Sequence, residues 1–203
     1  MTVGVVLGSL RPVEAALSFS NGGSGMNYSV TDSGLSQVIP DNNPSGVGYS
    51  INFANTGLSV NNISVTLNLS GGYNGDIYAY LSHGSQISTL LNNNPAVSGS
   101  GFNITLVEGT GNPIPTGGSG ILTGSSYTAY TDLATFNSTD PNGNWTLFFA
   151  DLNPGDTSTL NSFSIALTAV PEPITIALPI FGGLMITTWI VRRFIARPPQ
   201  NLA

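Results

Sequence analysis

The feature that most constrains the fold is an alternation of apolar and polar residues with a period of two. Residues 63–70 read Ile-Ser-Val-Thr-Leu-Asn-Leu-Ser, and residues 163–169 read Phe-Ser-Ile-Ala-Leu-Thr-Ala. Successive side chains of a strand point to opposite faces, so these segments predict strands that bury one face. Clusters of Gly, Asn, Pro and Asp follow or precede the strands, as at residues 71–75 and 140–143. Such residues favour turns, and the body of the chain is therefore predicted to be all-β.

Further segments have the length and composition of strands. Residues 77–81 and 145–150 are apolar or aromatic on both faces, which is typical of strands in the middle of a sheet. The remaining predicted strands are residues 49–53, 87–91, 102–107 and 127–136. About eight short strands at this spacing predict a jelly-roll-like β-sandwich.

Charge and cysteine content exclude several classes of function. Only 7% of the residues are charged, and residues 12–170 include nine acidic residues but no Lys or Arg. Nucleic acids and anionic lipid headgroups are bound through Lys and Arg, so neither is an expected partner. The chain has no cysteine, which excludes disulfides, thiol catalysis and thiolate metal sites.

The C-terminal part of the chain has the pattern of a membrane anchor. Residues 174–191 form a run of 18 residues without a charge. A helix of this length, at about 1.5 Å per residue, nearly matches a hydrocarbon core of roughly 30 Å. Arg192, Arg193 and Arg197 follow, and basic residues stay on the cytoplasmic side of a membrane. The sequence thus predicts one transmembrane helix, with the body of the protein outside the cytoplasm.

The N-terminal residues 1–16 are open to two interpretations. Residues 2–10 are apolar and a small-residue segment follows, as in a signal peptide that is cleaved near Ala15 or Ala16. The same apolar, β-branched residues would also suit a first β-strand. The predicted organisation is a signal peptide at residues 1–16, a sandwich at 17–169 and an anchoring tail at 170–203.

The tail resembles a known sorting signal. A Val-Pro-Glu-Pro motif, a short apolar segment and a pair of arginines together resemble the PEP-CTERM signal of exopolysaccharide-producing bacteria. The resemblance implies recognition and cleavage by a membrane protease called exosortase. It also implies an exported protein that is first held in the inner membrane and then reaches the cell surface or extracellular matrix. The residues of the motif are Val170, Pro171, Glu172 and Pro173.

The body resembles a second family, the P domain (P/Homo B) that follows the catalytic domain of subtilisin-like proprotein convertases. The resemblance implies a jelly-roll sandwich related to galactose-binding-like modules, with an accessory role beside a protease. The chain departs from the family because it lacks the catalytic domain and has His83 and Phe163 where proline and tryptophan are common. The segments that carry the resemblance are residues 39–42, 63–77, 81–84, 143–151 and 151–167.

His83 is the only histidine and has Ser82 and Ser85 beside it. A catalytic triad needs a nucleophile, a base and an orienting group that converge in space, which neighbours in one loop do not do. No Gly-x-Ser-x-Gly motif surrounds these serines. His83 is therefore predicted to be an ordinary loop residue, and the protein is predicted not to be an enzyme.

Asp76, Asp151 and Asp156 are the strongest candidates for a metal site. Calcium takes six to eight oxygen ligands, which loop aspartates and main-chain carbonyls supply. Aspartates in Gly-Asp turns also commonly bond their own backbone, so a purely structural role is the alternative. No other cofactor is expected.

Five tyrosines are candidates for a sugar-stacking surface: Tyr73, Tyr78, Tyr80, Tyr127 and Tyr130. Aromatic faces bind sugars in many modules, but tyrosine also fills the core and rim of sheets. The sequence thus predicts a structural or interaction protein of the cell surface or matrix. The alternatives are an exopolysaccharide-binding module and an accessory domain for a separate protease.

Overall fold

The computed structural model describes residues 10–12, 16–22, 25–53 and 58–171, together with Met185, Ile186 and Trp189. The chain divides into two compact units, Met1–Val170 and Pro171–Ala203. Within the described ranges, no helix has the length and hydrophobicity needed to span a bilayer. The predicted transmembrane segment at 174–191 lies outside the described residues, apart from the three helical residues just named.

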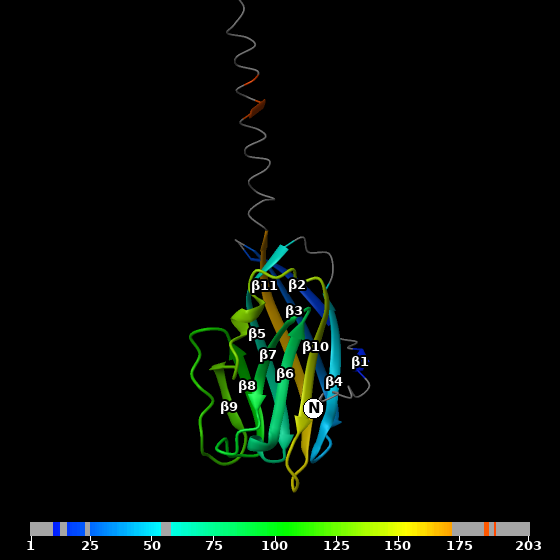
Figure 1. The fold of residues 1–203 in the computed structure, drawn as a ribbon, viewed down its shortest axis with the longest axis vertical. Helices are drawn as coiled ribbons and strands as arrows, with labels where there is room; N and C mark the ends of the chain where they lie inside the picture. Colours follow the sequence, from blue (N-terminus) through cyan, green and yellow to red (C-terminus); the bar gives the residue numbers. More distant parts are fainter. Residues whose placement is uncertain are drawn as a thin grey trace, which may run out of the picture. The chain divides into compact units, whose positions relative to one another are not determined.

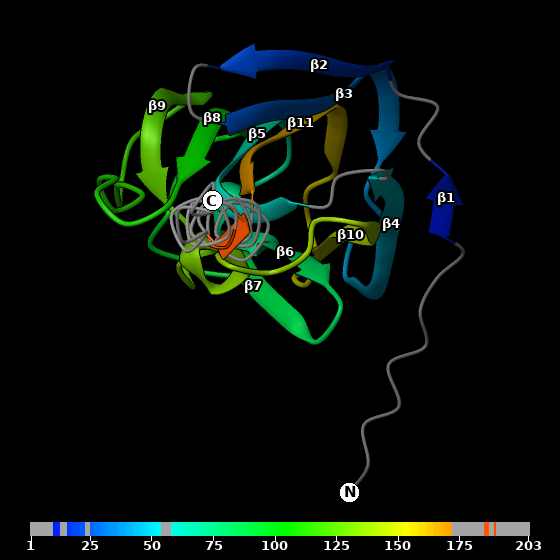
Figure 2. The ribbon, with the colours of Figure 1, turned by 90° about the horizontal axis from the view of Figure 1, so that it is seen from above.

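The first unit is a sandwich of two β-sheets (Figure 2), which confirms the all-β prediction. A five-stranded sheet has the order β1-β4-β10-β6-β7, and a six-stranded sheet has the order β2-β3-β11-β5-β8-β9. The strands of the five-stranded sheet are β1 (Leu10–Pro12), β4 (Asn43–Phe53), β6 (Ile77–His83), β7 (Gln86–Asn92) and β10 (Gly143–Asp151). The strands of the six-stranded sheet are β2 (Ala16–Gly22), β3 (Gly25–Val38), β5 (Leu58–Gly71), β8 (Gly101–Val107), β9 (Leu122–Thr128) and β11 (Ser158–Pro171).

Strand β10 occupies the centre of the five-stranded sheet (Figure 1), between β4 and β6 and antiparallel to both. Its inward side chains include Trp145, Leu147 and Phe149, all fully buried. Trp145 contacts the ring of Phe53 with a centroid distance of 6.0 Å and the ring of Phe136 with one of 5.0 Å. The apolar character of residues 145–150 on both faces thus marks a central strand, as the sequence predicts.

The outward side of the six-stranded sheet carries only small polar or small apolar side chains along its middle strands. The outward residues alternate along each strand with buried residues such as Val65, Leu67 and Ile165, so their side chains point away from the core. Cross-strand hydrogen bonds join several of them, including Thr66 to Thr105 at 3.0 Å and Thr168 to Asn27 at 2.7 Å. We call this surface the hydroxyl-amide face. It consists of Asn27, Ser29, Thr31, Ser64, Thr66, Asn68, Asn103, Thr105, Asn161, Ser164, Ala166 and Thr168.

Residues 127–136 differ from the single strand that the sequence predicts. Strand β9 ends at Thr128, and a 3-10 helix, η2 (Leu133–Phe136), follows. The Asp132 carboxylate accepts a hydrogen bond from the Ala134 N–H at 3.0 Å, which caps the helix and ends the extended backbone. Leu133 and Phe136, three residues apart on this turn, are both fully buried. The strand prediction is therefore wrong beyond Thr128.

The N-terminal region adds strands that the pattern did not predict. Strand β3 pairs with β11 and β2, and β1 pairs in parallel with β4. Leu10–Pro12 is thus extended, but the strand interpretation concerns residues 2–10, of which the structure describes only Leu10. Residues 1–9 and 13–15 lie outside the described residues, so the signal peptide at 1–16 stays a prediction.

Candidate functional site

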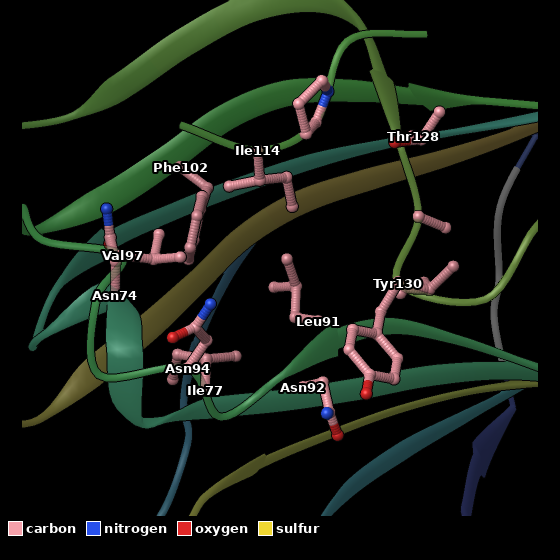
Figure 3. Close-up of a pocket in the computed structure, with 13 residues that line it drawn as sticks. Asn74, Ile77, Leu91, Asn92, Asn94, Val97, Phe102, Ile114, Thr128 and Tyr130 are labelled. Carbon is pink, nitrogen blue, oxygen red and sulfur yellow. The ribbon is translucent and has the colours of Figure 1, made fainter. Parts of the chain in front are cut away.

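A pocket of about 270 Å³ lies where an edge of the five-stranded sheet meets an edge of the six-stranded sheet (Figure 3). We call it the edge pocket. Its residues come from the segment of residues 74–77 at the start of β6, from β7 and β8, from the end of β9 and from the loops that join them, far apart in sequence. The lining residues are Asn74, Ile77, Leu90, Leu91, Asn92, Asn94, Val97, Phe102, Pro113, Ile114, Thr128, Ala129 and Tyr130.

Main-chain and amide hydrogen bonds hold the walls of the edge pocket. The Tyr130 N–H donates to the Leu90 carbonyl at 3.2 Å, so the segment after β9 runs along the free edge of β7. The Asn74 carboxamide oxygen accepts from the Gly101 N–H at 2.6 Å, and its amide nitrogen donates to the Ser98 carbonyl at 3.2 Å. Asn74, in the 3-10 helix η1 (Asn74–Asp76), is therefore a wall-forming residue whose polar groups are already used.

The chemistry of the edge pocket is neutral and mixed. Asn92 and Asn94 are exposed at its rim, and 70% of the Tyr130 side chain is accessible to solvent. Figure 3 shows Tyr130 and Asn92 on one side and Ile114 and Phe102 on the other. Apolar walls with a few polar groups at the rim are typical of small-ligand sites. No acidic or basic side chain lines the pocket, which suits an uncharged ligand that has both hydroxyls and an apolar face.

The five candidate tyrosines do not form one surface. Tyr130 stands at the edge pocket, whereas Tyr78 and Tyr80 lie on the outward side of β6, where Tyr80 stacks on Phe148 with a centroid distance of 4.9 Å. The Tyr73 hydroxyl donates to the Pro95 carbonyl at 2.7 Å, and the Tyr127 hydroxyl donates to the Thr123 carbonyl at 3.2 Å. Tyr73 and Tyr127 therefore have structural partners, and Tyr130 is the one that the edge pocket presents.

His83 ends strand β6 and contacts the core rather than a serine. Its ring stacks on the Trp145 indole with a centroid distance of 4.3 Å and an interplanar angle of 4°. Its Nδ1 lies 3.0 Å from the Asn144 carbonyl oxygen, and its Nε2 lies 2.7 Å from the Asp140 carbonyl oxygen. Main-chain carbonyls thus surround both ring nitrogens.

The three candidate metal-binding aspartates lie near one end of the sandwich. Asp151 ends β10, directly opposite Ile77 of β6, and Asp76 immediately precedes Ile77. Asp151 is fully buried, Asp76 is 8% exposed and Asp156 is exposed. Within the described residues, no group of three or more His, Asp or Glu side chains is arranged to hold a metal ion. The structure therefore places two buried carboxylates at this end, and calcium binding stays a prediction.

The Asp151 carboxylate has an unusual environment. Its pKa is raised to about 6, mainly by burial and also by the charges of Asp76, Asp41 and Asp156, while the Asn153 main-chain N–H acts to lower it. Neither carboxylate oxygen has a hydrogen bond of normal geometry within the described residues. Asp76 differs, since its Oδ1 accepts a hydrogen bond from the Asn153 amide at 2.8 Å. Nothing in the sequence distinguishes Asp151 from its acidic neighbours in this respect.

The tail positions lie almost wholly outside the described residues. Val170 and Pro171 are the last residues of β11. Glu172, Pro173, Arg192, Arg193 and Arg197 are not among the residues that the structure describes, so the sorting motif and the membrane orientation stay predictions.

Fold and site together define an all-β sandwich with a neutral pocket at one edge. No known family profile and no curated protein matches the chain. Among solved structures, the chain is similar to one in the crystal structure of an Aeromonas sobria serine protease in complex with a chaperone, with a TM-score of 0.48 and 15% identity. The match covers 77% of this chain and 28% of the other, so the present chain spans less than a third of that protein's length.

Proposed function

We propose that this chain is an exported, non-catalytic binding and interaction protein whose edge pocket takes a neutral, polyhydroxylated ligand of the carbohydrate type. The observation that carries this proposal is the combination of an exposed Tyr130 ring, the exposed amides of Asn92 and Asn94 and an uncharged, partly apolar lining. Aromatic rings pack on the apolar faces of sugars, while amides exchange hydrogen bonds with hydroxyls.

The environment of His83 supports a non-catalytic role. A general base needs a free ring nitrogen within reach of the nucleophile that it activates. In this chain both ring nitrogens lie beside main-chain carbonyls, and one face of the ring is stacked on Trp145. His83 therefore serves as a partner of the core, which favours a binding protein over a hydrolase.

The tail supports a location at the cell surface or in the extracellular matrix. In this proposal, residues 174–191 span the inner membrane, Arg192, Arg193 and Arg197 stay in the cytoplasm, and the sandwich lies outside. An exosortase-type protease then cleaves near Pro171-Glu172-Pro173, and the likeness of the body to a P domain favours a jelly-roll arrangement of the strands. Mass spectrometry of the mature protein from fractionated cells tests both ends, and a membrane-free protein with an intact tail would contradict this part.

A scaffold role is the second candidate, and the hydroxyl-amide face is the observation that favours it. This face also has a hollow of about 190 Å³, lined in part by Asn27, Asn62, Ser64 and Thr168. A broad surface of hydroxyls and amides suits contacts with a hydrated matrix polymer. The P-domain resemblance further suggests an accessory role beside a separately encoded protease, which co-purification from the producing cell would test.

Binding of the full chain to an array of neutral and acidic glycans tests the main proposal. We expect retention on a subset of neutral glycans, and about fivefold weaker binding for Tyr130→Ala, since an aromatic contact contributes roughly 1 kcal/mol. Asn92→Ala should also weaken binding. Tyr78→Ala, on the outward side of β6, and Asn103→Ala, on the hydroxyl-amide face, are matched controls that should bind like the wild type. Equal losses for the controls, or no retention of the wild type, would refute a sugar site in the edge pocket.

A further inference from the structure

The end of β10 holds a charged group in a position that normally belongs to the core. Asp151 shares its parity with Trp145, Leu147 and Phe149, so its side chain points to the inward side of the sheet. It is 0% exposed, and neither carboxylate oxygen has a hydrogen bond of normal geometry within the described residues, although the Asn153 main-chain N–H interacts with the carboxylate. Burial of an ionised carboxylate with so few partners is strongly unfavourable, and a cation bound beside it would relieve this cost.

The chain itself does not supply that positive species within the described residues. Strand register places Arg11 opposite Tyr49, six residues along β4 from Asn43, the partner of Asp151. His83 is likewise six residues along β6 from Ile77. At about 3.3 Å per residue, each of these backbone positions lies roughly 20 Å along its strand from the position opposite Asp151. The chain has no lysine, and its other arginines are at positions 192, 193 and 197, outside the described residues.

The groups that lie near Asp151 carry oxygen atoms rather than positive charges. Among the neighbouring acids, Asp76 has the strongest electrostatic effect on Asp151, followed by Asp41 and Asp156. The Asn153 amide bridges Asp76 Oδ1 at 2.8 Å and Asn93 Oδ1 at 3.4 Å, so amide and carboxylate oxygens lie together. Two buried carboxylates, neighbouring amides, main-chain carbonyls and water make the kind of oxygen-rich ligand set that calcium prefers.

We infer that Asp151 and Asp76 bind one divalent cation of the calcium type at the end of β10. The inference is independent of the edge pocket and of the proposed carbohydrate ligand. Two acidic residues are enough, because amide oxygens, main-chain carbonyls and waters commonly complete a calcium shell. The cation neutralises the buried charge and ties β10 to η1 and to the start of β6. Its effect is therefore structural.

Thermal unfolding of the full chain with calcium chloride and with chelator tests the inference. At a calcium concentration about a hundredfold above Kd, the melting temperature should rise by roughly 5–10 °C over the chelated protein. Asp151→Asn and Asp76→Asn should each abolish most of this shift. Asp140→Asn, at the opposite end of β10, is the matched control and should keep it.

Terbium luminescence, sensitised by nearby aromatic residues and displaced by calcium, provides a second readout that does not depend on stability. Titration of the wild type should saturate at one ion per chain, and titration of Asp76→Asn should not. If Asp151→Asn fails to fold, the Asp76→Asn titration alone decides. An unchanged wild-type melting temperature, a terbium signal that Asp76→Asn retains, or a calcium shift that both variants keep would overturn the inference.

Discussion

The two ends of strand β10 bury polar side chains on the same inward side, but these side chains differ in their hydrogen bonding. At the first end, the Trp145 indole N–H donates to the Pro141 carbonyl at 3.0 Å, and His83 stacks on the ring. At the other end, the Asp151 carboxylate is equally buried, but in the described part of the chain its oxygens have no hydrogen bond of normal geometry.

The two ends therefore differ in what their buried polar groups do: one stabilises the fold, and the other is available to bind a ligand. A buried polar group whose hydrogen bonds are complete within the protein stabilises one packing arrangement. A buried charge without partners costs stability until something outside the chain supplies them. We therefore expect substitutions at the Trp145 end to act on folding under all conditions. Those at the Asp151 end should act in a way that depends on pH and on cations.

The largest effect is expected from Trp145→Ala. Loss of this fully buried ring removes contacts with Phe53, Phe136 and His83 and should lower the free energy of unfolding by about 3–5 kcal/mol. Urea denaturation measures it, and the change should be the same with calcium or chelator. Trp145→Phe, the matched control, should lose clearly less. A calcium-dependent loss would show that the two ends are coupled.

The pH dependence of stability in chelator is the second test. The folded pKa of Asp151, about 6, lies above the ordinary aspartate value of 3.8, so the folded state binds the proton more tightly than the unfolded state. The resulting stabilisation is present below about pH 4 and is lost as pH rises through about 6, by about 3 kcal/mol in total. Urea denaturation at several pH values measures it. Asp151→Asn should remove this dependence, and an identical profile for the variant would assign it to other groups.

A smaller effect is expected from His83→Ala. The variant loses the ring stack on Trp145 and contacts with the two main-chain carbonyls, which together contribute about 1–2 kcal/mol. Chemical denaturation should place His83→Phe, which keeps a ring but not the polar contacts, between this variant and the wild type. If His83→Ala were as stable as the wild type, the completed polar contacts at this end would have no energetic role.

The smallest effect is expected from Asp156→Asn. This side chain is exposed, and a surface substitution usually changes stability by less than about 0.5 kcal/mol. Thermal melts with calcium should show nearly the wild-type shift. If the shift disappears, Asp156 belongs to the cation site together with Asp76 and Asp151, as the acidic pattern of the sequence suggests.

The sequence predicts the strands that have a clear hydrophobic pattern, either on one face or on both. Strands β5 and β11 follow from strict alternation, and β10 follows from its apolar residues on both faces. Strand β3 has weaker alternation, because Gly34 and several serines follow Tyr28 and Val30. At residues 133–136, apolar side chains that suit a strand are instead placed in the core by one 3-10 turn, which the Asp132 cap fixes.

The candidate sites were less predictable than the strands, because they depend on how distant segments meet. Tyr130 is recognisable as a candidate in the sequence, but its neighbours in the edge pocket come from four strands, a 3-10 helix and three loops. Asp151 is recognisable as an acid in a loop-like motif. Its inward orientation at the end of β10 depends on strand parity, next to a register shift between Phe149 and Asp151. Such features appear only once the sheet has formed.

Binding through the hydroxyl-amide face should depend little on salt concentration or pH. Screening by salt acts on charges, with a Debye length of about 10 Å at 0.1 M ionic strength, and hydroxyls and carboxamides do not titrate near neutral pH. Any adhesion through Asn68, Asn103, Thr66 and their neighbours should therefore persist in fresh water, brine or acidified surroundings. The aspartates at the end of β10, by contrast, respond to each of these changes.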